Sequence, residues 1–172
     1  MNKRYVIFIS SDAWYSEVIK FVESIGDKEK GFVPSHCGMD VSGHFREALA
    51  SGFVETNIDS YDKSKVRIFE IEVDDEHVEA GDTEFNKVWG RPYGWLALLN
   101  GAIYTLTGIE TEGDGEFTGD CSEDDTRILR AYGYDILPDV PADDITPYIL
   151  FKEVEKIGKL VENVWSIYKH RW

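Results

Sequence analysis

The sequence has little cysteine and no long apolar run, and both absences narrow the class of protein. Only 2 of its 172 residues are cysteines, Cys37 and Cys121, too few for a disulfide framework and wrongly spaced for a zinc site. No apolar stretch reaches the length of a bilayer crossing, and the apolar run near Met1 is too short for a signal peptide. We therefore expect a cytoplasmic protein in a reducing compartment, with no membrane span.

Positive charge is also scarce. Lysine and arginine total 18 against 33 aspartates and glutamates, which gives a formal net charge of −15 spread along most of the chain. Such a surface repels phosphate backbones and anionic membranes. Nucleic acid is therefore not expected as a partner, and the sequence leaves the oligomeric state open.

Length and composition predict one globular domain over residues 1–172. Hydrophobic residues make up 42% of the chain and aromatic residues 13%, and there is no internal repeat or linker. A domain of this length buries roughly 70% of its unfolded surface, so a hydrophobic core suffices without disulfides or metals.

Apolar patterns predict an α+β fold in which an antiparallel sheet packs against helices. Runs rich in β-formers predict strands, two of them joined as a hairpin, at 5–9, 35–41, 44–49, 53–58 and 66–73. Helical spacing and caps predict helices at 14–25, 74–89, 95–106 and 122–132, and a last long one that opens at 145–147 and continues over 152–172. The glycine-bearing acidic segment 110–120 is expected to be a loop, and it lacks the spacing of a calcium-binding EF-hand.

Cys121 is the candidate nucleophile. It directly precedes a predicted helix, where the positive end of the helix dipole favours a thiolate, and a glycine-bearing loop leads into it. A reactive cysteine needs a histidine that is distant in sequence. Among the four histidines, His36 at the head of a predicted strand is the best base, and Glu47 on the neighbouring strand could orient its ring.

These residues also carry a family resemblance. The segments Ser35-His36-Cys37-Gly38-Met39, Glu47-Ala48-Leu49, Gly90-Arg91-Pro92-Tyr93-Gly94-Trp95 and Cys121-Ser122-Glu123, in this order, resemble the YiiX-like, circularly permuted members of the NlpC-type, papain-like superfamily. In those proteins the histidine and the acid precede the cysteine in the chain.

The resemblance implies a permuted papain-like fold and a cysteine hydrolase of amide or ester bonds. It assigns Cys121 as nucleophile, His36 as general base and Glu47 as the orienting residue. Tyr93, Trp95 and Ser122 are the expected substrate-binding residues. The substrate would be a small molecule, a peptide or an acylated lipid or protein. No cofactor or metal is implied, since thiol hydrolysis needs none.

Other interpretations of the same residues remain open. Cys121 can be a small buried hydrophobic residue, His36 a hydrogen-bonded core histidine, and Glu47 a solvated strand residue. The chain also departs from the family pattern at Asp124 and Asp125, where an apolar pair is usual. Acids there oppose a nearby thiolate. A catalytically inactive binding or accessory module with the same fold is therefore the alternative function.

Overall fold

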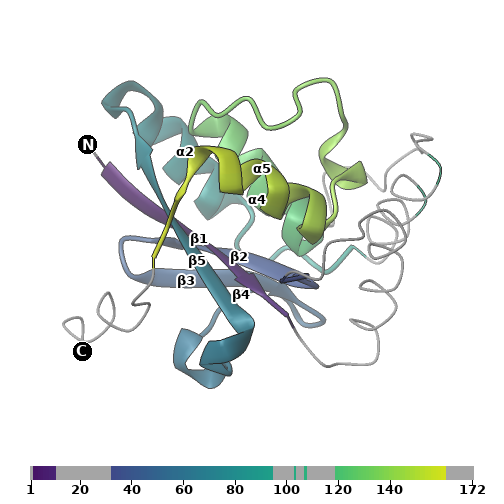
Figure 1. Ribbon diagram of the computed structural model, residues 1–172. Coiled ribbons are helices and arrows are strands. Elements are labelled where there is room, and N and C mark those ends of the chain that lie inside the picture. Colours follow the sequence, from purple (N-terminus) through teal and green to yellow (C-terminus); the bar gives the residue numbers. More distant parts are fainter. Residues whose placement is uncertain (1, 11–31, 95–102, 104–106, 108–118, 162–172) are drawn as a thin grey trace.

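The computed structural model describes residues 2–10, 32–94, 103, 107 and 119–161. These residues form an α+β fold with an antiparallel six-stranded sheet in the order β4-β3-β2-β1-β5-β6 (Figure 1). The strands are β1 (Asn2–Ile9), β2 (His36–Val41), β3 (His44–Leu49), β4 (Gly52–Glu55), β5 (Val66–Val73) and β6 (Lys159–Leu160). The α-helices in the described part of the chain are α2 (Asp75–Lys87), α4 (Cys121–Ala131) and α5 (Pro147–Ile157).

Strand β1 lies at the centre of the sheet and is buried on both faces, which explains its continuous apolar run. Its partners are β2, with Ile9 opposite His36, and β5, with Ile9 opposite Val66. Val6 and Phe8 belong to the core beneath the helices, whereas Tyr5, Ile7 and Ile9 belong to a cluster on the other face. Alternate residues of a strand point to opposite faces, so both faces need apolar residues here.

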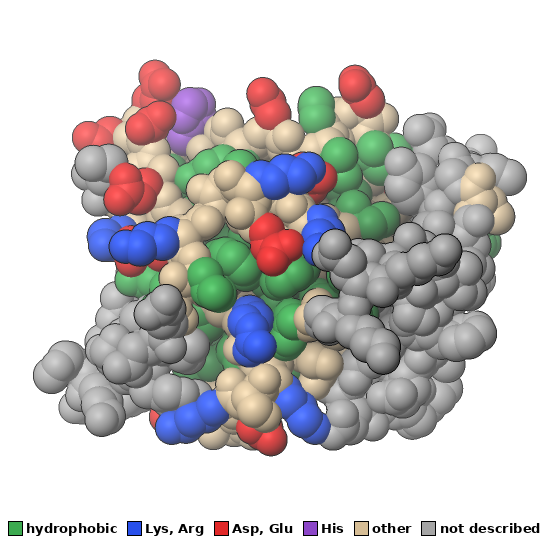
Figure 2. Space-filling view, in the orientation of Figure 1, with side chains coloured by type: hydrophobic (Ala, Val, Ile, Leu, Met, Phe, Trp, Pro, Cys, Tyr) green, Lys and Arg blue, Asp and Glu red, His purple; other side chains and the backbone are tan. Residues whose placement is uncertain are grey.

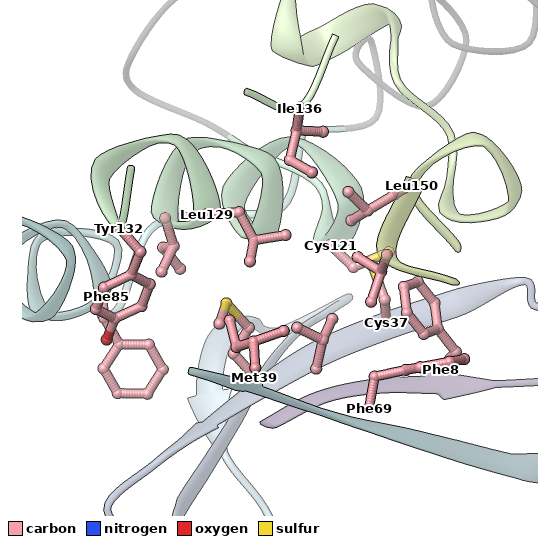
Figure 3. Packing of buried hydrophobic residues seen from close by; sticks show 14 of the residues in the cluster. Phe8, Cys37, Met39, Phe69, Phe85, Cys121, Leu129, Tyr132, Ile136 and Leu150 are labelled. Carbon is pink, nitrogen blue, oxygen red and sulfur yellow. The ribbon is translucent and has the colours of Figure 1, made fainter. Parts of the chain in front are cut away.

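The three α-helices of the described residues cover one face of the sheet (Figure 1). The core between them and the sheet includes Phe85 of α2, Leu129 of α4 and Leu150 of α5, which pack with Phe8 and Met39 of the strands (Figure 3). The opposite face carries a smaller cluster that includes Ile58, in the short 3-10 turn Ile58–Ser60. The helix α4 therefore lies directly over the strand β2 that carries His36.

Most of the elements expected in the described segments are confirmed. The strands at 5–9, 35–41, 44–49 and 66–73 match β1, β2, β3 and β5 within a few residues, and β4 covers the first part of 53–58. The helices at 74–89 and 122–132 match α2 and α4. The helices expected at 14–25 and 95–106, and most of the loop at 110–120, lie outside the described residues.

The prediction that the last helix runs unbroken over 152–172 was wrong, although residues 162–172 lie outside the described residues. Helix α5 begins at Pro147, as the sequence indicates, but it ends at Ile157. At Gly158 the backbone becomes extended, and the chain then pairs with β5 as the strand β6. Gly158 lies so close to Phe69 of β5 that an added Cβ would stand 3.0 Å from the Phe69 Cβ. Pairing with the sheet edge and the low helix propensity of glycine together override the amphipathic pattern.

The face seen in Figure 2 carries both charged and hydrophobic side chains. Acidic side chains lie along the helix layer, and basic ones lie among them and around a hydrophobic centre. None of the helices in the described segments is both long enough and apolar enough to cross a membrane.

Phe151 offers a test of the helix-to-sheet packing. Its buried ring lies 5.2 Å from the Phe8 ring, 5.7 Å from Phe69 and 5.5 Å from Phe32, measured between centroids. Phe151→Ala should therefore lower the free energy of unfolding by about 3–5 kcal/mol, because the cavity is lined by rigid aromatic rings. Ile157→Ala, in the same helix but 40% exposed, should change it by less than about 0.5 kcal/mol. Urea denaturation of both variants makes the comparison, and equal effects would contradict this packing.

Candidate active site

The structure brings His36, Glu47 and Cys121 together where β2 begins under the first turn of α4. His36 is the first residue of β2, and its Nε2 donates to Glu47 Oε2 at 2.7 Å. Cys121 is the first residue of α4, and its sulfur lies close enough to the His36 ring for each group to shift the pKa of the other. Three residues from distant parts of the sequence thus form a continuous chain from sulfur to imidazole to carboxylate.

Glu47 is fully buried and is held as a carboxylate by several donors. Besides His36, the Tyr61 hydroxyl donates to Glu47 Oε2 at 2.7 Å, and the Thr56 hydroxyl donates to Oε1. Burial acts to raise the pKa of Glu47, but the hydrogen bonds and the charge of His36 outweigh it and keep the pKa below its usual value. Glu47 is therefore not the solvated strand residue that was the alternative.

The surroundings of His36 and Cys121 favour the charged forms of both side chains, the imidazolium and the thiolate. Burial acts to lower the pKa of His36, yet the charges of Cys121 and Glu47 raise it well above the usual value. The pKa of Cys121 lies well below that of an ordinary thiol, chiefly because the Cys37 thiol donates a hydrogen bond to it and secondarily because of His36. A thiolate, an imidazolium and a carboxylate with alternating charges are the favoured resting state.

The first turn of α4 is fixed by its cap. Asp120 is the N-cap residue, and its Oδ1 accepts from the Glu123 N–H at 2.8 Å and from the Ser122 hydroxyl at 2.9 Å. Cys121 is thus inside the helix rather than just before it. Ser122 is fully buried, and its hydroxyl serves the cap.

The acids that follow the cysteine are buried and are paired with arginines. Arg91 forms an ion pair with Asp124, and Arg127 forms one with Glu123 at 2.8 Å, four residues along the same helix. Burial raises the pKa of Asp124 to about 7, although Arg91 lowers it. This pairing limits the repulsion that an acid at position 124 exerts on a thiolate at Cys121.

Asp125 behaves differently from its neighbour. It follows Cys121 by one helical turn, and its carboxyl lies against the Cys37 thiol. Neither of its oxygens accepts a hydrogen bond from a nitrogen or oxygen atom of the described residues. Burial, and then the nearby Cys121 thiolate, raise the pKa of Asp125 well above its usual value. We therefore treat Asp125 as a neutral carboxylic acid in the resting site.

Tyr93 lies next to the entry of α4, whereas Trp95 lies outside the described residues. Tyr93 forms an isolated bridge with Gly119, and the Gly94 N–H donates to the Gly119 carbonyl at 2.8 Å. An added Cβ on Gly119 would stand 2.6 Å from Asp124 Oδ1, so only glycine permits this approach. The half-buried Tyr93 is thus held beside the segment that leads into α4, and a substrate-binding role for it stays a prediction.

Sequence reasoning missed Cys37, Asp120, Thr56, Tyr61 and Arg91 as parts of this site. The cap had a signal, because Asp120 and Glu123 are spaced as in a capping box. Cys37 also had one, since it directly follows His36 in the predicted strand and so lies close to any nucleophile that His36 reaches. Thr56, Tyr61 and Arg91 reach the site from segments whose local pattern indicates no such contact.

Comparisons with known proteins do not assign the chain to a family. No protein-family model matches it, and no curated protein matches it significantly. Among the described residues, no group of three His, Cys, Asp or Glu side chains is arranged to hold a metal ion.

The pairing of Arg91 with Asp124 can be tested through its pH dependence. Because Arg91 lowers the pKa of Asp124, Arg91→Met should raise that pKa above its present value of about 7. Well above this pH the variant must bury an unpaired carboxylate, and its free energy of unfolding should fall by about 3–5 kcal/mol. Well below this pH Asp124 is neutral in both proteins, and the loss should be much smaller. Urea denaturation across pH measures this, and adding Asp124→Asn should remove the pH dependence of the loss.

Proposed function

We propose that this protein is a cysteine hydrolase of amide or ester bonds with a circularly permuted papain-like fold. The observation that carries the proposal is the proximity of the Cys121 sulfur to the ring of His36, which is itself hydrogen-bonded to the buried Glu47. The order of these residues in the sequence, and the position of the cysteine at the start of a helix above an antiparallel sheet, agree with the family resemblance.

In the proposed reaction, the Cys121 thiolate attacks the carbonyl carbon of the substrate and forms a C–S bond. The His36 imidazolium then gives its proton to the departing amine or alcohol as the C–N or C–O bond breaks, which leaves an acyl-enzyme. The neutral ring next takes a proton from water, whose oxygen attacks the acyl carbon. The carboxylic acid leaves and the thiolate is restored. No cofactor is needed.

Glu47 acts as a positioning residue in this scheme. It accepts a hydrogen bond from His36 Nε2, which leaves Nδ1 as the ring nitrogen available to the Cys121 sulfur. Thr56 and Tyr61 hold the carboxylate from other directions, so the ring has a fixed orientation and tautomer.

Backbone groups at the start of α4 supply the oxyanion site. Within the described residues, Asp120 takes the N–H of Glu123 through its side chain and that of Asp124 through its carbonyl. The N–H groups of Cys121 and Ser122 are those that this cap does not use. They lie beside the nucleophile at the positive end of the helix, where an oxyanion is stabilised.

One observation favours the alternative, a non-catalytic module with the same fold. The Cys121 side chain is buried with the residue only 3% exposed, whereas the His36 side chain is 14% exposed. A substrate must therefore reach the sulfur from the side of the His36 ring. In an inactive module no acyl group would reach Cys121 at all.

Alkylation by iodoacetamide tests whether Cys121 is activated. A thiol with the ordinary pKa of about 8.5 loses its reactivity as the pH falls below that value. Because the pKa of Cys121 lies well below the ordinary value, its alkylation rate should stay constant to a much lower pH. His36→Ala should raise the inflection by about 1–3 pH units, since it removes the opposite charge. The inflection, rather than the absolute rate, is the measurement, because burial slows the reagent equally at each pH.

Acylation provides the second half of this test. Activated esters and peptide amides should leave an acyl group on Cys121 that intact-mass and peptide analysis detect, and Cys121→Ala should carry none. An ordinary inflection together with no acyl adduct would overturn the hydrolase and leave the inactive module.

The role of Glu47 is tested with a matched pair of variants. Glu47→Gln should reduce the rate of acyl transfer from an activated ester by roughly 10²-fold or more and lower the pKa of His36, because the imidazolium loses its buried counter-charge. Glu55→Gln is the control, since Glu55 of β4 forms a similar pair with the exposed His44 of β3 at 3.1 Å. The control should leave the pH–rate profile unchanged. Equal profiles for both variants would remove Glu47 from the mechanism.

A further inference from the structure

The site contains a second thiol that the proposed hydrolysis does not use. Cys37 is fully buried in the core under α4, beside Cys121 (Figure 3). Its thiol and its backbone are close enough to the Cys121 sulfur to lower the pKa of that thiol. The two residues thus lie side by side in the core, yet both cysteines are free.

We propose that Cys37 is a resolving cysteine, which closes a reversible disulfide with Cys121 when a peroxide oxidises the nucleophile. The contact between the two thiols carries this inference. It concerns the regulation of the proposed hydrolase site, and it rests on the proposed function only in treating Cys121 as the reactive thiol.

The chemistry needs a hydroperoxide, with hydrogen peroxide as the simplest. The Cys121 thiolate attacks one peroxide oxygen, the O–O bond breaks, and the products are a sulfenic acid on Cys121 and hydroxide, which is protonated to water. The sulfur of Cys37 then attacks the sulfur of Cys121, forming the S–S bond as the S–O bond breaks. The departing hydroxide takes up the proton of the Cys37 thiol and leaves as a second water. The peroxide is reduced and the two thiols are oxidised.

The geometry suits the second step. Disulfide formation requires the two Cβ atoms to lie about 3.5–4.5 Å apart. Cys37 of β2 and Cys121 of α4 lie side by side in the core (Figure 3), and the strand and the helix pack against each other. The bond can therefore form between two elements that are already in contact.

Asp125 provides a route for the proton that Cys37 must lose. Its buried carboxyl is close enough to the Cys37 thiol for the two groups to affect each other's pKa, and neither of its oxygens has a hydrogen-bond partner among the described residues. In the resting site, burial and the Cys121 thiolate keep Asp125 neutral by raising its pKa. A sulfenic acid on Cys121 is uncharged, so the repulsion from the thiolate disappears and the carboxylate form of Asp125 becomes more accessible. It can then accept the proton and pass it on.

The consequence for the protein is a protected nucleophile. A sulfenic acid with no second thiol nearby goes on to sulfinic and sulfonic acids, which thiol reductants do not reverse. A disulfide with Cys37 stops this sequence and removes the nucleophile until a reductant restores it. The pair therefore acts as a redox-sensitive switch within the core.

Intact mass spectrometry of the full chain tests the proposal. The protein is treated with a few equivalents of hydrogen peroxide, and its remaining thiols are then alkylated under denaturing conditions. The wild type should lose two hydrogen atoms, take up no alkylating reagent and recover both thiols after dithiothreitol. Peptide mapping should show the segments around Cys37 and Cys121 linked. Cys37→Val should instead add two or three oxygen atoms at Cys121, and dithiothreitol should not remove them.

The outcome that overturns the proposal is read from the wild type alone, so it does not depend on whether the variant folds. Accumulation of sulfinic acid on wild-type Cys121, or survival of both thiols through the treatment, excludes a resolving role for Cys37. Cys37→Ser provides a second, smaller replacement. Because the measurement is a mass and not an activity, it is separate from the acylation test. Failure to acylate Cys121 would overturn the hydrolase, whereas failure to form the disulfide would overturn only this inference.

Discussion

The hydrogen bond between His36 and Glu47 is the interaction on which the rest of the site depends. It joins two strands, fixes which ring nitrogen faces the cysteine and supplies the negative charge that makes a buried imidazolium tolerable. Without it, burial would favour a neutral ring, and a neutral ring would give the Cys121 sulfur no opposite charge. The thiolate at the start of α4 is therefore stabilised from the sheet as well as from the helix dipole.

The same site shows how a strongly acidic chain keeps carboxylates next to a thiolate. Four acids occupy the cap and the first five residues of α4, and their charges are accommodated in three ways. Asp120 caps the helix, Glu123 and Asp124 pair with arginines, and Asp125 is held neutral by burial. Because these carboxyl groups are capped, paired or neutral, they repel the Cys121 thiolate less than four free carboxylates would. This is why the departure from the family pattern at positions 124 and 125 is compatible with an activated cysteine.

Much of the fold could be predicted from local patterns, because the patterns that mattered were periodic. The alternation along 66–73 and the paired runs at 35–41 and 44–49 are properties of single segments, and β5, β2 and β3 follow them closely. The last helix failed because its end depends on pairing with the edge of a sheet, through Gly158 against Phe69. The pattern within one segment does not show which distant strand will pair with it and end the helix.

The residues of the candidate site also fall into two groups, those that the sequence could predict and those that it could not. Cys121, His36 and Glu47 could be chosen because residue type, helix start and strand head limit where such chemistry can occur, and the family resemblance gave their order. Thr56, Tyr61 and Arg91 could not be found, since each contributes one long-range contact from a segment that looks ordinary. Cys37 was interpreted as a core residue, and it is one. Its contact with Cys121 follows only from the packing of α4 on β2.

Burial of Cys37 and Cys121 has two opposite effects on the reactivity of Cys121: it stabilises the thiolate, and it restricts access to the sulfur. A low-dielectric environment strengthens the attraction between the Cys121 thiolate and the His36 imidazolium, and it keeps the Cys37 proton in place as a donor. It also restricts access to the sulfur, which favours small reactants over large ones. A carbonyl compound must enter past the His36 ring, whereas a peroxide is close to water in size. The arrangement that suits a stable thiolate therefore also suits a nucleophile that needs a neighbouring thiol for protection.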